Sequence, residues 1–153
     1  MNLSRLLAYR SQIEDALRIE LTTAARMLQA AAEQAVCYEA DAKTQQLGYA
    51  DAARKGLTVE ETRHWYDGIE QASVKAVRSA ETHAALHREW MDKQSAVVEA
   101  MQERKKLDIL VSRRKEARQQ EQLREDQRLM DEQAARRRGV EIGRSLPRRD
   151  SHG

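Results

Sequence analysis

The stretch GYADAARKGLTVEE, residues 48–61, is where a chain that otherwise favours uninterrupted helix is expected to turn. Gly48 and Gly56 bracket this expected turn, and no proline occurs before Pro147. In a helix interior proline costs about 3 kcal/mol, and glycine about 1 kcal/mol, relative to alanine. The scarcity of both residues on either side of the stretch therefore predicts two long helices that fold back on each other.

The second helix has a clear start signal. Thr58 can accept a hydrogen bond from the first turn, and Glu61 can reach back to the amide of Thr58, which is the capping-box arrangement. Beyond residue 138, glycines and the single proline predict a flexible tail. We therefore expect a hairpin over 1–138, with one helix over about 3–50, a turn over about 51–57 and a second helix over about 58–138, followed by a tail over 139–153.

The composition predicts a narrow apolar seam rather than a thick core. The chain has 153 residues, no phenylalanine, 4% aromatic and 34% charged residues, and a mean hydropathy of -0.82. Such usage is typical of coiled coils and long helices. The fold class that we expect is all-α, a long two-helix antiparallel coiled-coil hairpin whose second helix overhangs the first.

Charge and cysteine content limit the classes of partner. The net charge is +2, from 27 basic and 25 acidic residues, and so favours neither a nucleic acid nor a membrane surface as partner. A single cysteine, Cys37, cannot form an internal disulfide, which suits a reducing cytoplasm. We find no apolar run long enough to span a bilayer and expect a soluble protein.

Apolar and small residues recur at steps of three and four in both expected helices, as a coiled-coil seam requires. The first seam comprises Ile13, Leu17, Leu21, Ala24, Leu28, Ala31, Ala35, Tyr38, Ala42, Gln45 and Tyr49. The second comprises Trp65, Ile69, Ala72, Ala76, Ser79, His83, Leu86, Trp90, Val97, Met101, Leu107 and Val111. The many alanines predict close helix packing.

A reversal near residue 53 sets an expected register. Residue i of the first helix would then face roughly residue 107 − i of the second, because both arms rise equally per residue. Leu17 would face Trp90. The apolar pattern of the second helix fades after Val111, so that helix should extend about 30 residues beyond the first. We interpret this charged extension as a binding element.

No group of residues predicts catalysis, a cofactor or a metal site. The chain has no phosphate-binding Gly-x-x-x-x-Gly-Lys loop. His83 and His87 lie one helical turn apart, but position 84 is alanine and no third ligand is evident. A narrow hairpin also lacks room for an enclosed pocket. We therefore expect no enzymatic activity, no cofactor and no small-molecule substrate.

Basic residues near the C-terminus, Arg136–Arg138, could meet phosphates. No aromatic residues alternate with them to stack on bases, and a solvated or protein-binding segment is the favoured interpretation. We expect no nucleic acid as partner.

Four short segments of the second helix, in this order and spacing, resemble the FliJ family of the flagellar type III export apparatus. They are Tyr66-x-x-Ile69, Trp90-Met-Asp-Lys93, the run Val98-Glu-Ala-Met-Gln-Glu-Arg-Lys-Lys-Leu107, and Met130-Asp-Glu-Gln133. The resemblance covers about residues 10 to 138.

The resemblance implies a stalk-like protein without catalytic activity. Members of this family bind the hexameric export ATPase, promote its assembly and activity, couple it to the cytoplasmic region of the export gate, and bind export chaperones. The chain would then be cytoplasmic, held at the inner membrane of the flagellar base through its partners. The implied gate contacts are Tyr66, Ile69 and Val77, and the implied ATPase contacts are Arg104, Lys105, Arg113, Arg114 and Arg118.

Two other functions fit the same pattern. A stalk of a virulence-type type III secretion system would share this architecture and differ only in its partners. A generic coiled-coil scaffold or a nucleic-acid accessory protein would share the seams but would not stimulate an export ATPase.

Overall fold

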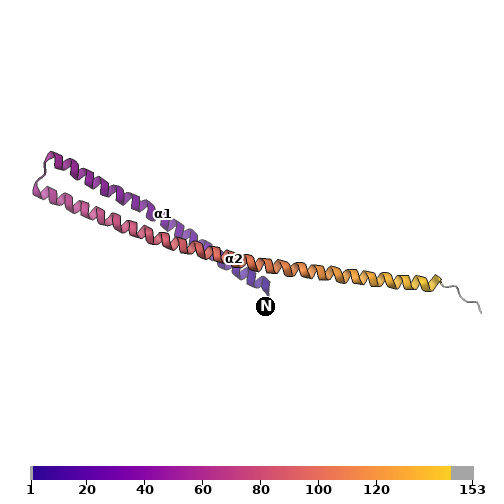
Figure 1. The fold of residues 1–153 in the computed structure, drawn as a ribbon. Helices are drawn as coiled ribbons and strands as arrows, with labels where there is room; N and C mark the ends of the chain where they lie inside the picture. The colour runs from indigo at the N-terminus through magenta and orange to yellow at the C-terminus, as the bar shows by residue number, and fades with distance from the viewer. Residues whose placement is uncertain (1, 146–153) are drawn as a thin grey trace, which may run out of the picture. The chain divides into compact units, whose positions relative to one another are not determined.

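The chain folds into two long helices, as shown by a computed structural model that describes the backbone of residues 2–145 and the side chains of residues 2–143. These helices are α1 (Leu3–Lys55) and α2 (Val59–Ser145). The chain divides into two units, with the boundary between Lys105 and Lys106. Within the first unit the two helices run side by side in opposite directions (Figure 1). The expected all-α helical hairpin is confirmed.

Gly56 ends α1 and makes the reversal possible. Its φ of 96° lies in a region that favours glycine, and its amide donates to the carbonyl of Ala53. Arg54 and Lys55 occupy the last turn, where cations interact favourably with the helix dipole. The helix therefore continues past the expected end near residue 50 and stops at Lys55.

The capping box at the start of α2 is present as expected. The amide of Glu61 donates to Thr58 Oγ1 over 3.2 Å, and the amide of Thr58 donates to Glu61 Oε2 over 3.4 Å. Glu60 and Glu61 also place negative charge in the first turn, where the helix dipole favours it.

The expected seams form the core of the hairpin. Every residue of the two seams is buried or half-buried, and Ala24, Ala31 and Val97 are the buried apolar members. Among the described residues no large side chain is fully buried. The seams are therefore confirmed, and the core that they make is as thin as their alanine content indicates.

The expected register is wrong. It would place Val59 beside Gly48, but Trp65 lies there instead: a Cβ added to Gly48 would come 2.9 Å from Trp65 Cη2. Gly48 lies within α1 rather than in the turn. Its missing side chain leaves room for the Trp65 indole. The chain reverses later, at residues 56–58, and this shifts α2 along α1.

The same shift overturns the expected pairing of Leu17 with Trp90. The guanidinium of Arg18, the residue after Leu17, reaches Met101 Sδ at 3.9 Å instead. Trp90 lies about three helical turns earlier along α2 and makes a ring contact with His87.

The second unit is helical as far as Ser145 and offers no buried side chain among its described residues. Leu107 and Val111 are half-buried, and all side chains of residues 112–143 are exposed. Oppositely charged residues recur three apart, as in Glu121 and Arg124 and in Glu125 and Arg128, a spacing that supports an exposed helix. The helix includes residues 139–145 of the expected tail. Residues 146–153 lie outside the described part of the chain.

Replacing Gly48 by leucine should destabilise the hairpin. The larger side chain would overlap the Trp65 ring, and overpacking of this kind costs about 1–3 kcal/mol. Urea denaturation followed by circular dichroism would measure the loss. Gly139→Ala is the control, since a Cβ at Gly139 meets nothing within 4 Å. A Gly48→Leu variant as stable as the unmodified chain would contradict the packing of Trp65 on Gly48.

Candidate interaction surfaces

Two tyrosines lie together near the turn. The hydroxyl of Tyr49 donates to that of Tyr66 over 3.3 Å, and the ring centroids are 5.3 Å apart. The hydrogen bond to Tyr66 raises the pKa of the Tyr49 hydroxyl. Tyr66 remains 57% exposed, so the pair presents an aromatic surface in a fixed position close to the turn.

The three residues expected to meet the export gate do not share one face. Tyr66 and Val77 are each 57% exposed and lie about three helical turns apart, which places them on the same side of α2. Ile69 is half-buried and belongs to the seam. Tyr66 and Val77 are therefore exposed on one side of α2, whereas Ile69 lies in the seam between the two helices.

The most buried charge of the hairpin is Glu14, which is only 4% exposed. Its carboxylate accepts from Arg104 Nε of α2 and, over 2.9 Å, from Arg18 of α1. Arg104, one of the expected ATPase contacts, is therefore an ion-pair partner inside the first unit. Glu14 was not among the residues predicted from the sequence to form a contact. Its position three residues before Leu17 continues the seam spacing and could have indicated it.

The ion pairs lower the pKa of the Glu14 carboxyl. The largest cause is the hydrogen bond from Arg104, followed by that from Arg18, and both outweigh the opposite effect of desolvation. A second cross-helix ion pair joins Lys93 and Glu20 at 3.0 Å, and it raises the pKa of the Lys93 ammonium. Both side chains of that second pair are partly exposed, so it is screened by solvent.

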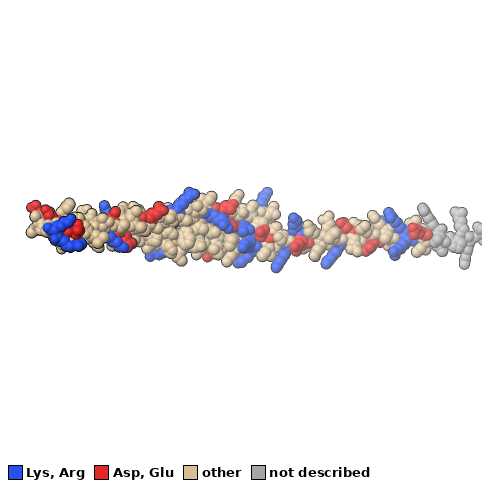
Figure 2. Space-filling view, turned by 90° about the horizontal axis from the view of Figure 1, so that it is seen from above, with Lys and Arg blue, Asp and Glu red and all other residues tan. Residues whose placement is uncertain are grey.

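The other expected ATPase contacts are exposed. Lys105 is the last residue of the first unit. In the second unit Arg113 and Arg114 are neighbours, and Arg118 follows Arg114 by about one helical turn. Figure 2 shows basic and acidic side chains interspersed along the visible face of the hairpin helices, without a large field of one sign.

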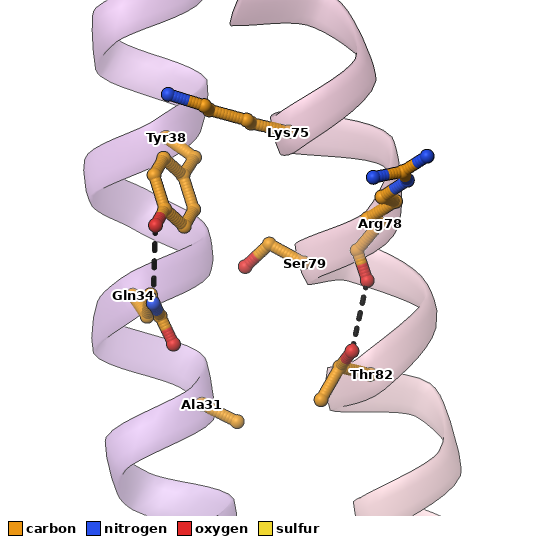
Figure 3. A pocket seen from close by; sticks show the side chains of 7 residues that line it. All are labelled: Ala31, Gln34, Tyr38, Lys75, Arg78, Ser79 and Thr82. Atoms are coloured by element: carbon orange, nitrogen blue, oxygen red, sulfur yellow. Dashed lines mark hydrogen bonds between the residues drawn. The ribbon is translucent and has the colours of Figure 1, made fainter.

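A shallow hollow lies between α1 and α2 beside Tyr38 (Figure 3). Small seam residues, Ala31 and Ser79, leave the space open, and Lys75 extends across it toward α1. Gln34 Nε2 donates to the Tyr38 hydroxyl over 3.2 Å. The hollow measures about 250 Å³, less than the roughly 300–1,000 Å³ of most small-molecule sites.

The described residues form neither a metal-binding cluster nor a membrane-spanning helix. No group of three or more His, Cys, Asp or Glu side chains within them could hold a metal ion. His83 lies half-buried in the seam, and the His87 ring lies tilted beside that of Trp90, with ring centroids 6.0 Å apart. In the same part of the chain, neither helix has a stretch apolar enough to cross a membrane.

A protein-family model matches most of the chain. The family model described as "Flagellar FliJ protein" matches residues 1–140. No curated protein and no solved structure gives a significant match.

Replacing Glu14 by glutamine should lower the melting temperature by several degrees, because Arg104 and Arg18 would lose their charged acceptor. Thermal denaturation at a series of pH values would measure the difference. Glu14 has a folded pKa below its ordinary value of 4.5, so its contribution is present above that pH and disappears as the pH falls through the folded pKa.

The matched comparison is Glu20→Gln, which removes the exposed pair with Lys93. This variant should lose less stability, since exposed ion pairs contribute little. A Glu14→Gln variant that melts with the unmodified chain at neutral pH would show that the buried pair does not hold the hairpin.

Proposed function

The chain belongs to the flagellar FliJ protein family and is a flagellar export-related protein, and on this premise we propose that it acts as the stalk of the export ATPase. In this role it has no catalytic activity of its own. It binds the hexameric ATPase, promotes its assembly and hydrolysis, and couples it to the export gate.

The observation that carries the proposal is the exposure of the side chains of the second unit. Its helix reaches Ser145, yet every side chain of residues 112–143 is exposed, including apolar ones such as Leu123 and Met130. Most helices in proteins gain their stability from tertiary packing of one face. A helix of this length with no such face is suited to insertion into a partner.

Exposed arginines supply the ATPase contact in this proposal. Arg113, Arg114 and Arg118 lie on the second unit, and Lys105 ends the first. Planar guanidinium groups pair with carboxylates in two parallel hydrogen bonds, which suits acidic residues lining a pore. Arg104 stabilises the hairpin through its ion pair with Glu14. To contact the ATPase directly, its guanidinium would have to bind Glu14 and an ATPase residue at the same time.

The gate contact is centred on Tyr66 and Val77. Both are exposed apolar residues on one side of α2, and buried aromatic anchors dominate many protein interfaces. Ile69 supports this surface from within the seam. Export chaperones are further proposed partners, and the site of action is the cytoplasmic side of the flagellar base, at the inner membrane.

A titration of purified export ATPase with this chain tests the stalk function. Hydrolysis should rise at ratios below one chain per ATPase monomer. The Arg114→Glu/Arg118→Glu variant should raise the concentration for half-stimulation by about tenfold or more, because two favourable charge contacts become repulsive. The control is Arg26→Glu/Arg63→Glu, which changes two exposed arginines of the first unit. Absence of stimulation by the unmodified chain would reject the stalk function.

A pull-down with the cytoplasmic region of the export gate tests the second contact. Tyr66→Ala and Val77→Ala should each weaken capture by about tenfold or more, as expected for interface anchors. Met27→Ala provides the control, since Met27 is an exposed apolar residue of α1. Unchanged capture by both variants would place the gate contact elsewhere.

A further inference from the structure

A second stripe, made mostly of small and apolar residues, runs along α2 within the first unit. Each of its members follows an inward-facing position by one residue and so lies about 100° around the helix from the seam. The steps alternate between four and three, as in a coiled-coil seam. The stripe, called the outer stripe below, comprises Ser73, Val77, Ala80, Ala84, His87, Met91, Gln94 and Val98.

The outer stripe is exposed from Val77 to Val98, although its composition is similar to that of the mostly half-buried seam beside it. Val77 is 57% exposed, Met91 51% and Val98 42%. Beside Val77 the surface is hollowed by about 370 Å³ between Ser73, Val74 and Glu81. Helices with two adjacent apolar faces pack on two sides, and in the first unit α1 covers only one of them.

We propose that the outer stripe is the contact between two copies of this chain, with the two α2 helices antiparallel across a two-fold axis. In this register Ala80 of one copy packs against Met91 of the other, and Ala84 packs against His87. The alanines at the centre let the helix backbones approach closely, while the valines fill the flanks. A two-fold contact uses the same patch on both copies, so each of these layers occurs twice.

Charge complementarity is what selects a second copy as the occupant. Glu81 and Arg88 lie seven residues apart on the outer border of the stripe, and neither makes an ion pair with another described residue. In the antiparallel register above, Glu81 of each copy faces Arg88 of the other, giving two ion pairs along the border. In a parallel pair the outer borders of the two stripes would lie on opposite sides of the contact, so Glu81 and Arg88 could not face each other and these two ion pairs would not form.

Sedimentation equilibrium of the full chain tests the proposal. The unmodified chain should show a concentration-dependent equilibrium between monomer and dimer. Glu81→Arg and Arg88→Glu should each weaken self-association by about tenfold or more, because both border pairs become repulsive. Both residues are exposed, so circular dichroism should show an intact hairpin.

Mixing the two single variants gives the sharpest outcome. In the antiparallel register the arginine introduced by Glu81→Arg in one copy meets the glutamate introduced by Arg88→Glu in the other. The second border pair of that heterodimer is an unchanged Arg88 with an unchanged Glu81. A heterodimer should therefore form with the affinity of the unmodified homodimer. The charge control is Glu33→Arg on α1, which lies away from the stripe.

Three results would overturn the proposal. They are a chain that remains monomeric, a dimer that tolerates Glu81→Arg as well as it tolerates Glu33→Arg, and a mixture of the two single variants that stays monomeric. A chain that remains monomeric but whose outer stripe is protected when another protein is added would assign this face to a different partner. The test does not depend on the stalk function, since it measures self-association alone.

Discussion

The hairpin depends on a seam of small residues that buries little area per residue. Only Ala24, Ala31 and Val97 are its buried apolar members, and no described large side chain is fully buried. Each layer of the seam contributes little stabilisation by apolar burial. The two helices must therefore stay aligned over many turns before the total stabilisation exceeds the cost of the conformational entropy lost on folding. Specific contacts near both ends of the paired region, Gly48 against Trp65 and Glu14 with Arg104, supply that alignment.

These two contacts act in different ways. At Gly48 the constraint is steric, because any added side chain would meet the Trp65 ring. At Glu14 it is electrostatic: a charge that is almost fully buried is tolerated only while both arginines remain on it. A slip of α2 by one turn would leave that carboxylate without its partner on α2, and an unpaired buried charge is strongly destabilising. The buried ion pair therefore selects one register among several that an alanine-rich seam would accept.

The helices, the seams and the capping box could be predicted from the sequence, because each rests on local spacing or local hydrogen bonding. The register could not, since a glycine such as Gly48 fits a turn and also fits close packing against a large ring. The ion pair between Arg104 and Glu14 could not be predicted either. The two residues lie on different helices, and only the correct register brings them together.

The outer stripe raises a further consequence for Val77, which belongs both to that stripe and to the surface proposed for the export gate. One side chain cannot serve a second copy and the gate at the same time. If self-association and gate binding share this residue, only the free monomer can bind the gate. The apparent affinity of the gate for the chain is then reduced in proportion to the fraction of monomer. A weak dimer would then hold the apolar face covered until a partner of higher affinity replaces the second copy. The small number of large apolar residues in the outer stripe fits this exchange. With more of them, two copies would bind each other too tightly for the gate to replace one of them.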